Sequence, residues 1–191
     1  MQPFNLVKSI INGRVSLRKM FFVYSNDKSA AGYKTDKGYI TEKYFDTVYR
    51  LALSQTKQQH YAEDVTQEVF LKFYKTDKSF ESEEHAKAWL LRVTLNCSKD
   101  VFLNSWFKKT APMSEADGKI TFDTAEKSDI YYAVSELPQK YRAVIHLFYY
   151  EDYSVREIAE LLKTKESTVK SQLSRGRDML RDKLKGGAYF V

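Results

Sequence analysis

The chain has 191 residues, of which 43% are hydrophobic and 15% aromatic, and its formal net charge is +6 at pH 7. This apolar content excludes a globally disordered protein, because it can supply a buried core. The single cysteine, Cys97, excludes an internal disulfide, and no segment reaches the roughly 18 apolar residues that cross a bilayer. We therefore expect a soluble, cytoplasmic protein.

Helical periodicity dominates the first half of the chain from about residue 40 onward. Residues 1–39 precede it, and their basic, aperiodic sequence predicts a poorly ordered N-terminal extension. The first helix is expected to begin near Thr41. Three successive segments each carry an apolar stripe at helical spacing: Phe45, Val48, Leu51 and Ala52; then Ala62, Val65, Val69 and Phe73; then Trp89, Leu90, Val93, Cys97 and Val101.

Residues 108–128 break this pattern. They mix Pro, Gly, Ser, Thr and charged residues with little periodicity, which is typical of a flexible linker. Helical patterns resume at residue 129, stop before Pro138 and restart there, since proline is favoured in the first turn of a helix. The sequence predicts an all-α protein with two small helical domains, 40–107 and 129–185, and a C-terminal tail, 186–191.

The stretch SVREIAELLKTKESTVKSQLSRGRDML, residues 154–180, reads as two short helices joined by a tight polar turn. Ten residues separate Ala159 from Val169, which is the spacing of a helix-turn-helix. In the second helix, Val169, Leu173, Gly176 and Leu180 fall within one arc. The missing side chain of Gly176 would permit another helix to approach closely.

The opposite side of this second helix carries hydroxyl and cationic side chains. Residues 163–185 hold 8 basic and 3 acidic side chains, so the local charge is positive. Such groups hydrogen-bond phosphates and base edges in the major groove, although a plain solvated surface would have similar residues. We interpret this face as a DNA-binding surface: Ser167, Lys170, Ser171, Ser174 and Arg175.

Two longer stretches carry a family resemblance. YFDTVYRLALSQTKQQHYAEDVTQEVFLKFYK with AWLLRVTLNCSKD resembles the second conserved region of bacterial sigma factors, and LPQKYRAVIHLFYYEDYSVREIAELLKTKESTVKSQLSRGRDML resembles the fourth. The layout without a third region is similar to the extracytoplasmic-function (ECF) group of the sigma-70 family. The resemblance implies a domain 2 helical bundle, a domain 4 helix-turn-helix, and a sigma factor that directs transcription initiation.

The resemblance also implies partners and contact residues. Core RNA polymerase would be bound through its β′ clamp helices and its β subunit, promoter DNA through its minus-ten and minus-35 elements, and an anti-sigma factor would restrain the protein. Ordinary helix chemistry or core packing remains the alternative for several positions, above all Trp89 and Phe80. The implied polymerase contacts are Asp64, Gln67, Glu68 and Leu71; the minus-ten contacts are Phe80, Trp89, Arg92, Asn96 and Lys99; the minus-35 contacts are Arg156, Ser167, Thr168, Lys170, Ser171, Ser174, Arg175 and Arg177.

Enzyme chemistry finds no support in the sequence. The histidines His60, His85 and His146 are scattered, without metal-ligand spacing, and no phosphate loop or nucleophile elbow occurs. We expect no catalytic residue, metal, cofactor or small-molecule substrate. Two alternatives to a sigma factor remain: an autonomous helix-turn-helix regulator, and a helical adaptor whose basic helix binds an acidic protein.

Overall fold

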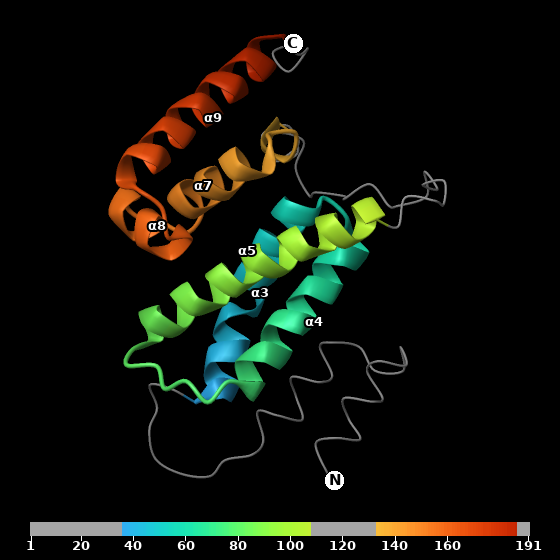
Figure 1. Cartoon of the computed structure of the whole chain (residues 1–191), viewed down its shortest axis with the longest axis vertical. Helices are drawn as coiled ribbons and strands as arrows, with labels where there is room; N and C mark the ends of the chain where they lie inside the picture. The colour runs from blue at the N-terminus through green and yellow to red at the C-terminus, as the bar shows by residue number, and fades with distance from the viewer. Residues whose placement is uncertain (1–35, 108–132, 187–191) are drawn as a thin grey trace.

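The computed structural model describes residues 36–107 and 133–186, which are helical with no strand (Figure 1). The expected linker, 108–128, lies outside the described residues, as do most of the expected N-terminal extension and C-terminal tail. Within the described part, no helix is long and apolar enough to cross a membrane. The helices are α3 (Lys37–Thr56), α4 (Gln59–Lys75), α5 (Glu83–Phe107), α7 (Gln139–Tyr149), α8 (Val155–Leu162) and α9 (Glu166–Gly186).

Helix α3 begins four residues before the start at Thr41 that the sequence predicted. Asp36 is its N-cap, and the Asp36 carboxylate accepts a hydrogen bond from the backbone two residues further on. The next residue, Lys37, donates through Nζ to the backbone carbonyl of Thr76, 2.8 Å away at the end of α4. Residues 36–39 therefore belong to the helical bundle and not to the N-terminal extension.

Helices α3, α4 and α5 pack together around an aromatic centre. Phe73 of α4 lies with its ring centroid 5.5 Å from that of Phe80 and 5.7 Å from that of Trp89. Phe80 and Trp89 are also in edge contact, at 5.8 Å. These separations are typical of stabilising aromatic pairs, so the loop between α4 and α5 is anchored to the core by Phe80.

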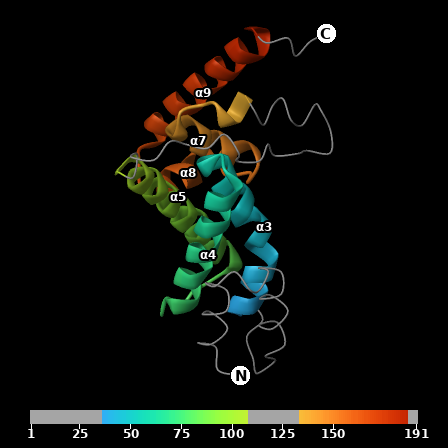
Figure 2. The ribbon, with the colours of Figure 1, turned by 90° about the vertical axis from the view of Figure 1, so that its right-hand side faces the viewer.

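Helices α7, α8 and α9 form a second unit, in which α9 packs against both shorter helices (Figures 1 and 2). Ile158 of α8 and Val169 of α9 are fully buried, together with Leu147 of α7. These three side chains belong to the same hydrophobic cluster. The apolar stripes predicted for the helix-turn-helix are thus its core.

The hydrophobic cluster of the second unit extends into the first. Leu51 of α3 and Leu91 and Leu95 of α5 are at most 3% exposed and pack with the side chains of α7 and α8. The sequence predicted a single buried stripe on α5, through Leu90 and Cys97, and missed this second one. Helix α5 is buried on two sides because it lies between the two units.

Polar contacts reinforce this packing. Arg142 of α7, only 2% exposed, donates to the carbonyl of Gln55, 3.2 Å away in the last turn of α3, and to the carbonyl of Ser135. Carbonyls at a helix C-terminus lack intrahelical partners and attract cations, so Arg142 suits this position. The contact joins residues that are 87 positions apart in sequence.

Replacing Leu91 by Ala tests the shared core. We expect the free energy of unfolding to fall by about 2–5 kcal/mol, the usual result of truncating a buried leucine. Urea denaturation followed by circular dichroism measures this change. Replacing the exposed Glu42 by Ala is the control and should change stability by no more than about 0.5 kcal/mol; a similarly small loss for Leu91→Ala would contradict tight packing between the units.

Candidate DNA and polymerase interfaces

The helix-turn-helix starts with a capping box. The Ser154 side chain accepts from the backbone N–H of Glu157, and the Glu157 carboxylate accepts from the backbone N–H of Ser154 at 2.8 Å. These hydrogen bonds hold the pKa of the Glu157 carboxyl below its usual range. Helix α8 ends at Leu162, and the left-handed backbone of its C-cap Lys163 (φ 51°) turns the chain toward α9.

Helix α9 is pressed onto α7 at Gly176. A Cβ atom placed on Gly176 would lie 3.1 Å from Cγ1 of Ile145, closer than nine in ten real Cβ contacts. The sequence predicted this close approach, and the structure confirms it. The contact fixes which side of α9 is buried, and therefore which side faces solvent.

The predicted minus-35 side chains all face solvent. Ser171 donates through its hydroxyl to the carbonyl of Ser167, at 2.8 Å, so its oxygen remains available as an acceptor. Arg177 lies over the ring of Phe148 at 5.7 Å, and Arg156 pairs with Glu160 at 3.1 Å. The exposed set comprises Arg156, Ser167, Thr168, Lys170, Ser171, Ser174, Arg175 and Arg177.

Helix α4 presents the predicted polymerase stripe away from its core side. Asp64 and Glu68 are exposed, while Gln67 and Leu71 are half-buried. Glu68 pairs with Lys72 at 3.2 Å, and Lys72 also lies 3.3 Å from the Cys97 sulfur. The stripe therefore combines exposed carboxylates with a small apolar contact, as a protein interface does.

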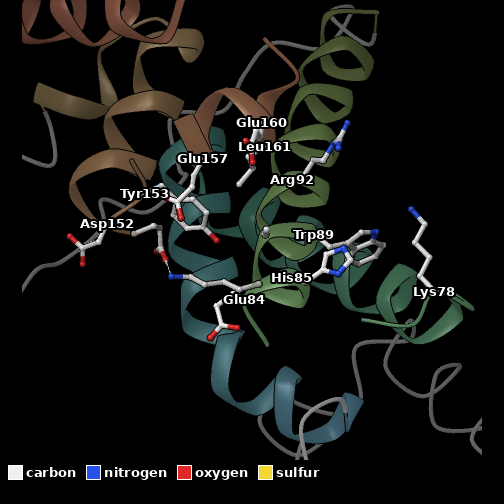
Figure 3. A pocket seen from close by; sticks show the side chains of 13 residues that line it. Lys78, Glu84, His85, Trp89, Arg92, Asp152, Tyr153, Glu157, Glu160 and Leu161 are labelled. Carbon is white, nitrogen blue, oxygen red and sulfur yellow. Dashed lines mark ion pairs between the residues drawn. The ribbon is translucent and has the colours of Figure 1, made fainter. Parts of the chain in front are cut away.

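The predicted minus-ten residues divide into two groups. Phe80 is buried in the aromatic centre and offers no stacking surface in this structure. Asn96 and Lys99 are exposed on α5, whereas Trp89 and Arg92 are half-buried. Both of these last residues line a cavity of about 710 Å³ between α5 and the second unit (Figure 3).

The far wall of this cavity was not anticipated from the sequence. It is acidic, and the α7–α8 turn approaches α5 there through an ion pair of 2.9 Å between Lys87 and Glu151. Burial opposes ionisation of Glu151, but the neighbouring His146 and Lys87 outweigh it, so the pKa of Glu151 lies below its usual range. The signal in the sequence was the clustering of acidic residues after α7: Glu151, Asp152, Glu157 and Glu160.

Among the residues that the structure describes, no cluster of His, Cys, Asp or Glu could hold a metal ion. The surfaces described above are instead the basic helix α9, the stripe of α4 that carries Asp64 and Glu68, and the cavity between α5 and the second unit. Together with the buried helix-turn-helix core they are typical of a helical DNA-binding protein that carries a second helical unit.

Comparison with known proteins identifies the family. The family described as Sigma-70 region 2 matches residues 40–107, and the family described as Sigma-70, region 4 matches residues 127–180. The ECF RNA polymerase sigma factor SigW of Bacillus subtilis is 30% identical over 163 residues, covering 76% of this chain and 87% of SigW. SigM of the same organism is 30% identical over 151 residues, covering 74% and 91%.

Solved structures share the fold. Sigma factor RpoE of Bartonella quintana, in complex with the anti-sigma factor NepR, matches with a TM-score of 0.65 at 22% identity, over 76% of this chain and 94% of RpoE. CnrH, in complex with the cytosolic domain of CnrY, matches with a TM-score of 0.57 at 20% identity, over 80% and 89%.

The chain belongs to the sigma-70 family, in its extracytoplasmic-function group. Region 2 is the unit of α3, α4 and α5, and region 4 is the unit of α7, α8 and α9. Proteins of this group recognise promoters and initiate transcription with core RNA polymerase, which agrees with the function that the sequence predicted.

Replacing Gly176 by Leu tests the packing that orients α9. We expect overpacking against Ile145 to lower the free energy of unfolding by about 1–3 kcal/mol. Ser174→Leu introduces the same side chain on the exposed side of α9 and should change stability by no more than about 0.5 kcal/mol. Thermal unfolding compares the two variants; equal melting temperatures would show that Gly176 is not required for close packing.

Proposed function

We propose that the three exposed surfaces divide the work of promoter recognition in this chain. Helix α9 reads the minus-35 element, helix α5 holds the minus-ten element, and the α4 stripe docks on the β′ clamp helices of core polymerase. The proposal rests on the difference between the buried side and the exposed side of α9. Val169, Leu173 and Gly176 are buried, while the hydroxyls of Ser167, Thr168, Ser171 and Ser174 and the cations Lys170, Arg175 and Arg177 are exposed.

The side chains of α9 suit the major groove. Arg175 and Lys170 can donate to guanine O6 and N7, and the hydroxyls of Ser171 and Ser174 can hydrogen-bond either base edges or phosphates. Each phosphate contact that Arg156 or Arg177 makes would release counterions, so binding should weaken as salt rises. Arg156 and Arg177 would therefore position region 4 on the phosphates, while Lys170 and Arg175 would read the bases.

The polymerase contact rests on Asp64 and Glu68 of α4. Their exposed carboxylates complement a cationic partner and would steer its approach, since charge complementarity sets orientation and association rate. Gln67 and Leu71 lie beside them and supply hydrogen bonding and apolar area. Helix α5 would contribute Arg92, Asn96 and Lys99 along an unpaired strand, with Trp89 as a stacking surface.

An anti-sigma factor is the third proposed partner. Both structural relatives named above are in complexes, RpoE with an anti-sigma factor and CnrH with the cytosolic domain of CnrY. Because core polymerase and promoter DNA are the proposed partners, we expect the protein to act in the cytoplasm. The proposed function requires neither catalysis nor a cofactor.

In-vitro transcription on a library of genomic fragments, with core RNA polymerase and with or without this protein, tests the proposed function. We expect protein-dependent initiation at sites that share two spaced sequence elements. If core polymerase neither binds the protein nor initiates with it, while the protein alone selects duplex sites, the chain is an autonomous regulator and the proposal is wrong.

Two substitutions separate the surfaces. Arg175→Ala should weaken recognition of the minus-35 duplex by about 1–3 kcal/mol, the usual contribution of one bidentate arginine, and leave the affinity for core polymerase unchanged. Asp64→Lys should lower the affinity for core polymerase about tenfold and leave duplex binding unchanged. Fluorescence anisotropy measures both affinities.

Glu42→Lys makes the same change of charge as Asp64→Lys on an exposed part of α3 and serves as its control. If it weakens polymerase binding as much as Asp64→Lys does, the contact is a general charge effect and the α4 stripe is not the docking site.

A further inference from the structure

The two arginines beside Gly176 lie at the edges of the exposed side of α9. Neighbouring side chains of a helix are about 100° apart, so Arg175 and Arg177 lie on opposite flanks of the glycine. Both are exposed, while Gly176 is pressed onto α7. The two side chains therefore leave α9 where α7 packs alongside it (Figures 1 and 2).

Arg177 lies against two aromatic rings of α7. Its guanidinium carbon is 5.7 Å from the ring centroid of Phe148 and 6.0 Å from that of Tyr149. The two rings are in edge contact with each other, with centroids 5.0 Å apart. Tyr149 is 53% exposed, so its ring contributes little to the apolar core and is available to the cation. Cation–π contacts of this kind hold a guanidinium in place and leave its N–H groups available to a ligand.

Arg175 lies against a third aromatic side chain of α7, that of Tyr141. A Cβ atom placed on Gly176 would be 3.6 Å from Cβ of Tyr141, so this tyrosine packs directly beside α9. A hydrogen bond from the Arg175 guanidinium holds the pKa of the Tyr141 phenol below its ordinary value, and Lys140 acts in the same direction. Lys140 Nζ also lies 4.9 Å from the ring centroid. The phenol oxygen of Tyr141 thus accepts from Arg175, while its ring contacts Lys140 and α9.

Neither of these two arginines is neutralised by a carboxylate. In the part of the chain that the structure describes, no ion pair involves Arg175 or Arg177, whereas Arg181 of the same helix pairs with Asp178 at 3.0 Å. A long side chain loses rotamer freedom when it binds a ligand, and holding it in place beforehand removes part of that cost. The aromatic side chains of α7 restrict both guanidinium groups and preserve their charge.

We propose that α7 is part of the minus-35 surface and that its aromatic side chains are positioning residues for the two arginines. Tyr141, through its hydroxyl, orients Arg175 toward a base edge, and the rings of Phe148 and Tyr149 hold Arg177 for a phosphate. The ligand is duplex DNA. This inference rests on the minus-35 role proposed above for α9, and it adds residues outside the helix-turn-helix that determine base discrimination and affinity.

The two contacts use different parts of the tyrosine, so the same substitution separates them. Tyr141→Phe removes the hydroxyl that accepts from Arg175 and should loosen this arginine. Tyr149→Phe keeps the ring beside Arg177 and should leave binding unchanged, whereas Tyr149→Ala removes the ring. Because base contacts specify and phosphate contacts position, Tyr141→Phe should lower base discrimination and Tyr149→Ala should lower affinity for all duplexes alike.

Selection from duplexes with randomised base pairs measures base discrimination. The full chain is bound to core RNA polymerase, and the sequences that each variant enriches are compared with those of the parent. Arg175→Ala should lose the preference at one base pair of the minus-35 element, and Tyr141→Phe should weaken the preference at the same base pair about three- to tenfold. Unchanged preference in Tyr141→Phe, or a change at a different base pair, would overturn the assignment of Tyr141.

Fluorescence anisotropy with the duplex that the parent enriches most separates positioning from direct contact. Tyr149→Ala should weaken binding about two- to fivefold, for this duplex and for its single-base variants alike. In an Arg177→Ala background, Tyr149→Ala should have no further effect, because no arginine is left to hold. A loss of the same size in that background shows that Tyr149 contacts DNA itself, and its positioning role is then wrong.

Tyr39→Ala is the matched control for Tyr149→Ala. Tyr39 is also an exposed tyrosine beside a cation, with Lys43 Nζ 5.6 Å from its ring centroid, but it lies on α3. Its replacement should leave duplex binding unchanged; a loss as large as that of Tyr149→Ala would contradict the inference. Thermal unfolding of every variant shows whether a loss of binding is a loss of folding.

The two proposals fail in different ways. If the parent complex enriches no minus-35 sequence, or if Arg175→Ala changes no base preference, α9 does not read that element and this inference falls with the proposed function. If Arg175→Ala abolishes a base preference that Tyr141→Phe retains in full, and Tyr149→Ala binds DNA as the parent does, only the inference is overturned.

Discussion

The arrangement of this protein depends on the burial of α5 on two sides. One stripe of α5 completes the core of region 2 through Leu90 and Cys97, and a second, through Leu91 and Leu95, belongs to the core of region 4. Each fully buried leucine contributes about 1.5–3 kcal/mol relative to an exposed one. One helix thus determines both the internal packing of region 2 and the position of region 4.

Charge follows the same division. Region 4 places most of its cations on α9, whereas Glu151, Asp152, Glu157 and Glu160 lie on the α7–α8 turn and α8 and line the cavity beside α5. The positive side is suited to phosphates and the negative side to the cationic residues of α5. Because Gly176 presses α9 onto α7, the orientation of both sides is set by apolar packing, and the charged groups follow from it.

Separating the two regions would break the packing between them. Leu51, Leu91 and Leu95 would lose their cover, and Arg142 would lose its acceptor at the end of α3. Contiguous apolar surface of this kind is normally covered by a partner. Separation is therefore favoured when a binding partner compensates for these lost contacts, which couples the geometry of the chain to what it is bound to.

The sequence by itself determined the helix class, the helix-turn-helix and the exposed side of α9, because helical periodicity and the ten-residue spacing from Ala159 to Val169 are local properties. It also indicated the close contact at Gly176. Tertiary structure alone decided the early start of α3, whose Lys37 reaches the end of α4, the burial of Phe80 and the second buried stripe of α5. It also decided the contacts from Arg142 to Gln55 and from Lys87 to Glu151. Each of these joins groups distant in sequence, and no local pattern specifies which distant group will lie opposite.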